Sequence, residues 1–376
     1  LGAMVQSNLL RKLVASGRPL PAAVAAVSQD APVADELLAR YRQAQALQGG
    51  LTPELEGLLS QEDVTDVLIN GPESVWVDRG RGLQRARMYL GDGAQLRELA
   101  VRMAAACGQR LDDAAPILDG VLPSGTRVNA LLPPLADQVT ISLRTFRRHS
   151  FSLAELVDSG TVNAELASIL AQAVQAKVSG LISGGTGTGK TTLLSALLGQ
   201  VNHSERIVCI EEVGELRPRH PHVVHLTERK PNVEGVGGIS LSALLRASLR
   251  MRPDRVVVGE CRGEEVREMM SALNTGHEGG WATLHANGVR EVPARLLALG
   301  AMASMSEAAV AAQAAAAFGA VIHLSRNRGS RWVSEIGVPH YDGGRLQVQR
   351  VLYVPTPGAE LIREGQLPWQ ESETYM

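Results

Sequence analysis

A glycine-rich segment near the middle of the chain has the spacing of a phosphate-binding loop. The pattern G-x-x-x-x-G-K-[ST] is matched from Gly184 to Thr191. Glycines in such a pattern let the backbone turn its N–H groups inward around phosphate oxygens. Lys190, one of four lysines in the chain, can reach the β- and γ-phosphates, and the Thr191 hydroxyl can ligate Mg²⁺.

The context of this segment also fits a phosphate loop. Apolar residues, including Leu181 and Ile182, precede it and predict a strand, and a leucine- and alanine-rich run after it predicts a helix. The positive end of that helix is directed at the same phosphate oxygens. We therefore predict a site for ATP and Mg²⁺. The residues predicted to contact the nucleotide form one run: Gly184, Gly185, Thr186, Gly187, Thr188, Gly189, Lys190, Thr191 and Thr192.

Two further apolar segments end in carboxylates. Glu260 follows the predicted strand 255–259, and Glu211 and Glu212 follow the predicted strand 206–210. Ligands of open α/β sheets bind at the carboxyl ends of the strands, where these acids would meet. We predict that Glu260 holds Mg²⁺ through water and orients the attacking water. Of the other two acids we favour Glu211 for the chemistry, and a metal-binding role for Glu212 stays open.

Two histidines flank another short predicted strand, at residues 282–285. His277 precedes it and His285 ends it. An imidazole near neutral pH can sense or donate to a phosphate, although a lone histidine is more often structural. Arg262, two residues beyond Glu260, is predicted to orient that carboxylate or to complete the site.

The elements that must position these residues alternate between helix and strand. The predicted helices are 164–176, 190–198 and 241–251, and the predicted strands are 178–183, 206–210, 255–259 and 282–285. Such alternation indicates an α/β fold with a mostly parallel sheet and helices on both faces.

The earlier part of the chain predicts a different, smaller α+β domain. Its predicted strands are 64–70, 74–78, 127–132 and 140–146, and its predicted helix is 96–107. We accordingly divide the chain into a helical N-terminal extension at 1–50, an α+β domain at 51–150, a nucleotide-binding domain at 151–355 and a loosely ordered tail at 356–376. The hinge between the two domains is expected from His149 to about Gly160.

Composition narrows the possible partners. A net charge of −2 and a pI of about 6.6, without a basic run interleaved with aromatics, disfavour a nucleic-acid motor. The three cysteines, Cys107, Cys209 and Cys261, are isolated in the sequence. A structural zinc site is therefore not expected, and we expect the protein to reside in a reducing compartment. No signal peptide is predicted, and the weakly apolar, alanine-rich stretch 308–321 suits a packed helix better than a membrane span.

These motifs, in this order, resemble those of the type II/IV secretion and type IV pilus ATPase superfamily, and most of all its Tad/Flp-pilus branch, often labelled conjugal-transfer-associated. That superfamily carries a phosphate loop, an acidic box, a strand ending in Gly-Glu and a histidine box. The segments that carry the resemblance are Arg250 to Gly263, Asn274 to Gly279, Val64 to Pro72 and Pro123 to Ala130.

The resemblance implies a RecA-like phosphate-loop domain and a homohexameric ring. In such a ring nucleotide lies between the two domains, and arginines of the first domain, here Arg127 and Arg144 by motif match, reach the phosphates. It also implies an inner-membrane platform protein as partner and a cytoplasmic position at the inner face of the membrane. The chain departs from the family pattern where Glu212 replaces the usual Asp, and it lacks the four-cysteine zinc module of many type II secretion members.

The function expected from this resemblance is a Mg²⁺-dependent ATP-hydrolysing ring motor that powers assembly of Tad/Flp-type pili or related protein secretion. Two alternatives remain. One is a type IV secretion or conjugation ATPase, which shares the chemistry and differs in cargo. The other is a nucleotide-binding scaffold with little turnover.

Overall fold

The computed structural model describes residues 49–61, 63–80, 82–145, 150–231, 235–327 and 329–370. The helical extension predicted at 1–50 lies outside the described residues except for its last two positions, as do the end of the predicted strand 140–146 and the start of the predicted hinge. The chain divides into an N-terminal unit, residues 1–148 with 232–236, and a C-terminal unit, residues 149–231 with 237–376. Each unit is described by itself.

The N-terminal unit is built on a six-stranded sheet in the order β3-β2-β1-β6-β5-β4. All neighbouring strands pair antiparallel. Its elements are α4 (Pro53–Leu59), β1 (Asp66–Asn70), β2 (Val75–Asp78), β3 (Leu83–Ala86), α5 (Gly93–Ala106), β4 (Ile117–Val121), β5 (Arg127–Leu131) and β6 (Thr140–Arg144). The sequence did not predict α4, β3 or β4.

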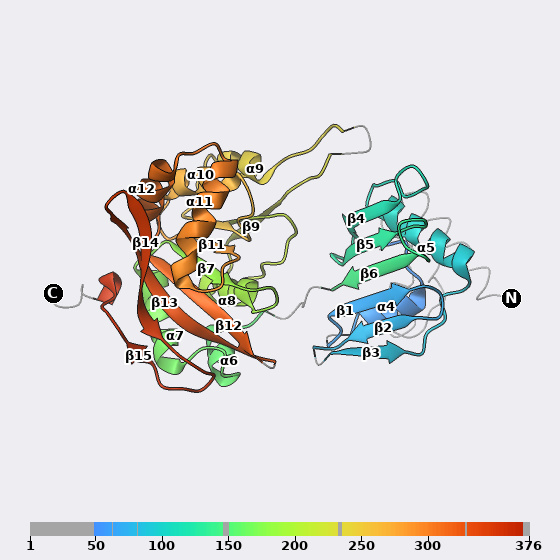
Figure 1. The fold of residues 1–376 in the computed structure, drawn as a ribbon, viewed down its shortest axis with the longest axis horizontal. Helices are drawn as coiled ribbons and strands as arrows, with labels where there is room; N and C mark the ends of the chain where they lie inside the picture. Colours follow the sequence, from blue (N-terminus) through green and yellow to red (C-terminus); the bar gives the residue numbers. More distant parts are fainter. Residues whose placement is uncertain are drawn as a thin grey trace. The chain divides into compact units, whose positions relative to one another are not determined.

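The helices α4 and α5 lie on one side of this sheet (Figure 1). Alternate residues of the strands, such as Val67 and Ile69 on β1, pack with Leu96 and Met103 of α5 in one core, as the period of two in a strand requires. A box of hydrogen bonds between Asp92 and Gln95 caps the start of α5, which is why the helix begins three residues earlier than predicted.

The C-terminal unit contains a nine-stranded sheet in the order β15-β14-β13-β12-β7-β11-β10-β8-β9. The six strands from β12 to β9 in this order pair in parallel, and β13 to β15 extend the sheet as antiparallel strands. The strands are β7 (Gly180–Gly184), β8 (Ile207–Glu211), β9 (Val223–Thr227), β10 (Arg255–Val258), β11 (Trp281–Leu284), β12 (Ala320–Asn327), β13 (Ser330–Asp342), β14 (Arg345–Tyr353) and β15 (Ile362–Arg363). The predicted α/β fold with a mostly parallel sheet is confirmed.

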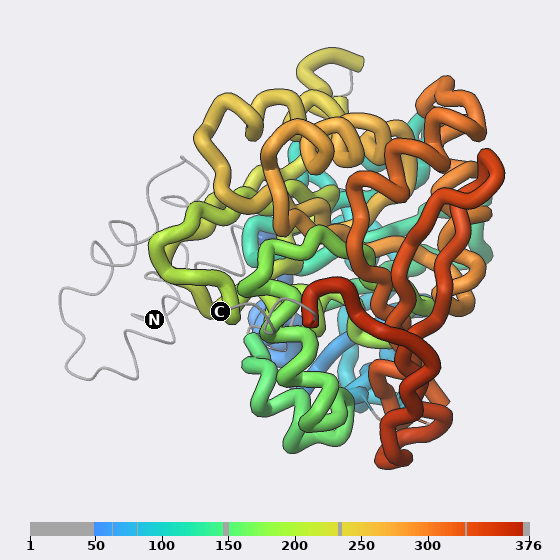
Figure 2. Tube along the Cα trace, turned by 90° about the vertical axis from the view of Figure 1, so that its left-hand side faces the viewer, coloured from blue at the N-terminus to red at the C-terminus, as the bar shows by residue number. Residues whose placement is uncertain are grey.

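Helices cover both faces of this sheet, as Figure 1 shows. They are α6 (Leu153–Asp158), α7 (Ala164–Gln175) and α8 (Lys190–Leu198) over one core, and α9 (Leu241–Ser248), α10 (Glu265–Leu273), α11 (Val292–Met302) and α12 (Glu307–Ala317) over the other, with the short 3₁₀ helix η1 (Val289–Glu291) before α11. In Figure 2 the red hairpin β13–β14 runs beside the orange helices α11 and α12. Among the described helices none has the length and apolar character needed to cross a bilayer.

The expectation of a loosely ordered tail after residue 355 is wrong for residues 356–370. Leu367 is buried, and Ala359, Leu361 and Trp369 pack on the same core. Strand β15 pairs with β14. The Pro, Gly and Glu content of this segment suggested disorder, but four of its apolar side chains pack against the core of the C-terminal unit.

A buried arginine ties together the amino edge of the parallel sheet. Arg255, at the start of β10, has a side chain only 1% exposed and donates from Nε to Glu205 Oε2 at 2.7 Å. Its Nη2 donates to Val174 O at 3.0 Å and its Nη1 to Gly279 O at 3.3 Å. Because a Cβ on Gly279 would lie 1.8 Å from Arg255 Nη1, the glycine is needed for the arginine to fit.

Substitution of Gly279 tests this packing. Gly279 and Gly276 both have positive φ, +74° and +99°, but a Cβ on Gly276 would meet no atom within 4 Å. We expect Gly276→Ala to cost about 1–2 kcal/mol for the left-handed backbone and Gly279→Ala to cost about 1–3 kcal/mol more for overpacking. Urea unfolding of the two variants, followed by tryptophan fluorescence, measures the difference. Equal midpoints for both would show that the Arg255 side chain can move aside without loss of stability.

Candidate active site

The phosphate loop begins where the buried strand β7 ends. Gly184, Gly187 and Gly189 have φ of +153°, +71° and +98°, a region in which only glycine is free of strain. Helix α8 starts at Lys190, and its N-cap, Gly189, has no side chain to bond the first N–H groups. A buried strand, a left-handed glycine turn and an uncapped helix start thus converge, and this is an anion cradle.

Lys190 lies inside this cradle with its side chain largely buried. Its Nζ donates to Gly184 O at 3.0 Å and to Gly185 O at 3.1 Å, so the ammonium points back over its own loop. Burial holds the pKa of Lys190 below its usual range, and Glu260 partly opposes this shift. A desolvated ammonium beside a glycine-rich loop has the charge expected of a group that binds the β- and γ-phosphates of a nucleotide.

A chain of charged side chains leads from Lys190 to the neighbouring strand ends. Lys190 Nζ lies 3.4 Å from His285 Nδ1, and His285 Nε2 lies 2.8 Å from Glu260 Oε1. Arg262 then bridges two carboxylates, with Nη2 2.7 Å from Glu260 Oε2 and Nη1 2.8 Å from Glu212 Oε2. These side chains follow β11, β10 and β8, so the structure gathers them at one carboxyl edge.

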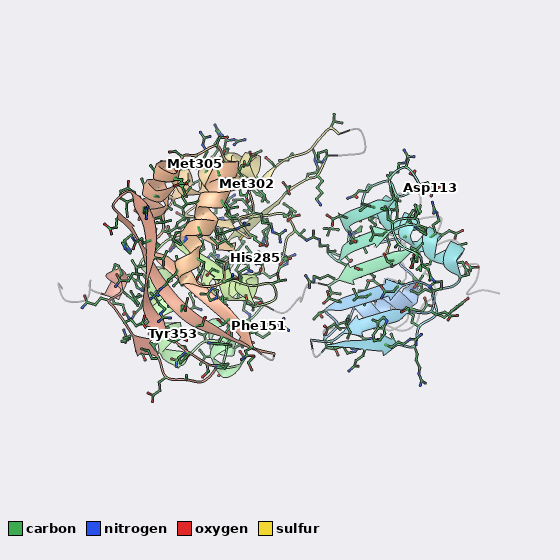
Figure 3. The ribbon with its side chains drawn as sticks, viewed as in Figure 1. Asp113, Phe151, His285, Met302, Met305 and Tyr353 are labelled. Carbon is green, nitrogen blue, oxygen red and sulfur yellow. The ribbon has the colours of Figure 1, made fainter. Side chains whose placement is uncertain are left out.

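His285 is the neutral link in this chain. Its pKa lies below the usual value, first because of burial and second because of the Lys190 charge, while Glu260 acts in the opposite direction. The two ring nitrogens of His285 thus face groups of opposite charge, Nδ1 toward Lys190 and Nε2 toward Glu260. Figure 3 labels His285 at this edge of the C-terminal unit.

Glu211 and Glu212, adjacent in sequence, have different surroundings. The Glu211 side chain is 3% exposed, and its Oε1 accepts from the backbone N–H groups of Glu215 and Leu216, both at 2.8 Å. Glu212 is the one that meets Arg262. Glu212 lies in the row of ionisable side chains, and Glu211 Oε1 lies under the turn that follows β8. The second oxygen, Glu211 Oε2, is buried and has no hydrogen-bond partner among the described residues, so the chemical role that the sequence favours for Glu211 stays a prediction.

His277 is not brought to this edge. Its Nδ1 lies 3.3 Å from Ala272 O near the end of α10, and the loop after it meets the amino end of β7, where Gly279 N donates to Ser179 Oγ at 2.9 Å. The strand β11 therefore separates His277 from His285 along its whole length. The two histidines flank one strand in sequence, so His277 lies near the amino ends of the parallel strands and His285 near their carboxyl ends.

Arg127 and Arg144 lie side by side in the N-terminal unit. They are Cα partners on β5 and β6. Arg127 Nη2 is 3.5 Å from Asp119 Oδ1, and Arg144 Nε is 3.0 Å from Asp66 Oδ1. Like charges opposite each other repel, and each guanidinium here has a carboxylate that offsets the repulsion.

Comparison with known proteins places the chain in a family. The family described as "Type II/IV secretion system protein" matches residues 52–364. The chain belongs to this family. A putative conjugal transfer protein of Mycobacterium tuberculosis is 48% identical over 326 residues, which cover 84% of this chain and 92% of that protein. The type IV secretion system protein PtlH of Bordetella pertussis is 35% identical over 252 residues, 61% of this chain and 74% of PtlH.

Solved structures of similar fold support the same architecture for this secretion-family chain. The pilus retraction motor PilT with bound ADP has a TM-score of 0.52 at 17% identity and covers 84% of both chains. The ATPase DotB of Legionella pneumophila has a TM-score of 0.51 at 21% identity, covering 80% of this chain and 79% of DotB. At these identities the likeness concerns the fold, and it confirms the predicted RecA-like arrangement with a preceding α+β unit.

Sequence reasoning missed two side chains that support the site of this family member. Glu265 Oε1 accepts from Arg262 N at 2.6 Å and from Gly263 N at 2.9 Å, which fixes the loop that carries Arg262. Thr283 Oγ1 donates to Gly259 O at 2.6 Å and ties the ends of β11 and β10 together. The acid three residues after Arg262, at the start of a helix, is a capping signal that predicts the first of these contacts.

We expect Glu211 and Glu212 to differ in their effect on stability. Glu211→Ala removes the acceptor of the buried Leu216 N–H and of the partly buried Glu215 N–H, and should lower the free energy of unfolding by about 1–3 kcal/mol. Glu212→Ala breaks a half-exposed ion pair and should lower it by less than about 1 kcal/mol. Urea denaturation of both variants measures this contrast. The reverse order would assign the structural role to Glu212.

The low pKa of His285 can be tested through Lys190. Lys190→Met removes the positive charge that opposes protonation of the ring, so the His285 pKa should rise toward its ordinary value. Because the folded pKa is depressed, neutral His285 contributes stability above the unfolded pKa that is lost as pH falls through the folded pKa. NMR titration of ¹³C-labelled histidine measures the shift, with Lys177→Met, which removes an exposed lysine paired with Glu205, as the control. An unshifted pKa in Lys190→Met would assign the depression to burial alone.

Proposed function

We propose that the chain is a Mg²⁺-dependent ATP-hydrolysing motor of the type II/IV secretion family. The observation that carries the proposal is the continuous row of ionisable side chains from Lys190 in the phosphate loop, through His285, to Glu260 at the end of β10. One end of this row lies where a γ-phosphate would be held, and the other is a carboxylate able to act on water. A loop that only bound nucleotide would not require the second part.

The roles follow from the geometry. The N–H groups of residues 184–192 and the Lys190 ammonium bind the phosphates and stabilise charge that develops on the γ-phosphate. Glu260 orients and activates the attacking water. His285 lies between Glu260 and Lys190, so it holds that carboxylate beside the phosphate. Arg262 holds the other Glu260 oxygen and links it to Glu212.

The oxygen donors near the loop fit Mg²⁺, which prefers carboxylates, hydroxyls and water. The Thr191 hydroxyl follows Lys190 at the start of α8, and Glu260 would bind through water because Arg262 and His285 occupy its two oxygens. The ion held by these residues would supply positive charge to offset the charge of the phosphates. Glu212, already paired with Arg262, is assigned to orienting that arginine. Glu211 is assigned to supporting the turn after β8.

Beyond one chain, the proposal includes a homohexamer in which Arg127 and Arg144 reach the phosphates. Two adjacent guanidiniums form a planar, permanently charged surface for phosphate, and their contacts with Asp119 and Asp66 are exchangeable, half-exposed ion pairs. The ring would work at the cytoplasmic face of the membrane with a platform protein of a Tad/Flp-type pilus. The second candidate is conjugation or type IV secretion, which is favoured by the similarity to a putative conjugal transfer protein and to the type IV secretion system protein PtlH.

Steady-state ATP hydrolysis by the full chain with Mg²⁺ tests this proposal. Glu260→Gln should bind ATP as wild type does and lower kcat by about 10²-fold or more, and Lys190→Met should lose ATP binding. Glu264→Gln, in the same loop but exposed, is the matched control and should keep full turnover. An Arg127→Gln/Arg144→Gln double variant should lower kcat without loss of the assembled mass, as followed by light scattering.

The possible outcomes separate the alternatives. Turnover that needs Glu260 and rises with formation of a roughly six-subunit species supports the motor. Tight ATP binding with turnover at background in every assembly state, unchanged by Glu260→Gln, supports a nucleotide-binding scaffold and rejects the hydrolytic role.

A further inference from the structure

The turn that carries His285 is anchored by a carboxylate from a distant strand. After β11 the chain passes through residues 285–288 into η1, and Val289 N donates to Glu335 Oε2 at 2.9 Å. Glu335 lies on β13, which is separated from β11 by β12 and β7. The hydrogen bond between Glu335 and Val289 therefore reaches across β12 and β7 at the carboxyl ends of the parallel strands.

The backbone approaches Glu335 closely at this point. A Cβ on Gly288 would lie 2.5 Å from Glu291 Oε2 and 3.4 Å from Glu335 Oε2. Gly288 is extended, a conformation open to any residue. The turn thus runs beside two carboxylates, of which Glu291 is exposed and Glu335 accepts the Val289 N–H.

Glu335 is itself held by a fork of charged groups. Its Oε1 lies 3.2 Å from Arg350 Nη1 on β14. Arg350 bonds Glu364 with both Nε and Nη2, at 2.8 and 2.7 Å, and its guanidinium lies 4.1 Å from the ring centre of Tyr353. The two carboxylates, Glu364 first, raise the pKa of Arg350 and keep it charged. Figure 3 labels Tyr353 on this strand.

We infer that Glu335 is a positioning residue for ATP hydrolysis, which holds the His285 turn and is oriented in turn by Arg350 and Glu364. This inference rests on the proposed function. His285 can hold the Glu260 carboxylate beside the reacting phosphate only if the His285 backbone is fixed, because a displacement of about 1 Å can cost on the order of 10²-fold in rate. The last antiparallel strands of the sheet supply that fixation here. They lie beyond the motifs from which the nucleotide site was predicted.

The inference predicts a slower chemical step with unchanged nucleotide affinity. Glu335→Ala removes the acceptor for Val289 N–H and should lower kcat by about 10-fold, with the ATP dissociation constant within about 2-fold of wild type. Glu335→Gln keeps an oxygen for Val289 and should lose less. Asp342→Ala, which removes an exposed acid from the same hairpin, is the matched control and should have wild-type kcat.

A double-mutant cycle with His285 separates positioning from general stability. If Glu335 acts through the His285 turn, Glu335→Ala should add little to the loss already caused by His285→Ala. Hydrogen exchange measured by mass spectrometry gives a readout that does not depend on activity: residues 285–291 should exchange faster in Glu335→Ala and normally in Asp342→Ala. Equal losses of kcat in both backgrounds, or unchanged exchange in this segment, would overturn the inference.

Arg350→Lys keeps the test decisive if Glu335→Ala does not fold. Lysine preserves the positive charge but cannot form the bidentate bond with Glu364. Hydrogen exchange at residues 285–291 should therefore still rise, and kcat should fall by a few-fold. Wild-type values for both would reject the inference that Arg350 and Glu364 orient Glu335. Failure of the proposed function is recognised separately. It would appear as turnover insensitive to Glu260→Gln, whereas Glu260-dependent turnover that ignores Glu335→Ala rejects this inference alone.

Discussion

The burial of the Lys190 ammonium at the carboxyl edge of a parallel sheet is the constraint on which the site depends. A desolvated cation needs oxygen partners, and the described structure supplies the carbonyls of Gly184 and Gly185 together with the Glu260 charge two links away. Phosphate oxygens would meet the same need. The partners and neighbours of Lys190 within the protein lie at the ends of β7, β10 and β11, and this is where the proposed nucleotide site is located.

Two edges of the same sheet perform different tasks. At the carboxyl edge the charges are half-exposed and linked in a row, which leaves them able to change partners. At the amino edge Arg255 is buried, and carbonyls as well as Glu205 satisfy it. Removing one member of such a buried pair is costly, so this edge is rigid. Gly279, in the segment that follows His277, belongs to this edge and is accounted for by its packing against Arg255.

The sequence predicted the phosphate loop, the strands on either side of it and the acids at the strand ends, because spacing alone carries that information. It did not predict β12 to β15, although residues Arg345 to Gln349 of β14 alternate between polar and apolar with the period of a strand. Nor could it show which of Glu211 and Glu212 turns inward. Neighbouring residues at a strand end point to opposite sides, and the side that is buried depends on the strand packed beside it.

That neighbouring strand explains two departures in the motifs at once. Gly259 occupies a position where many phosphate-loop proteins carry an acid, and a Cβ there would lie 2.8 Å from Glu211 Cγ. The Glu211 side chain thus fills the space that a larger residue at 259 would need, and its carboxylate caps the turn at Glu215 and Leu216. With Glu211 committed to that turn, the second acid of the pair faces Arg262. Its extra methylene relative to aspartate lets the carboxylate meet the guanidinium at 2.8 Å. Gly259 therefore leaves the space that the buried Glu211 side chain occupies, while Glu212 remains available to Arg262.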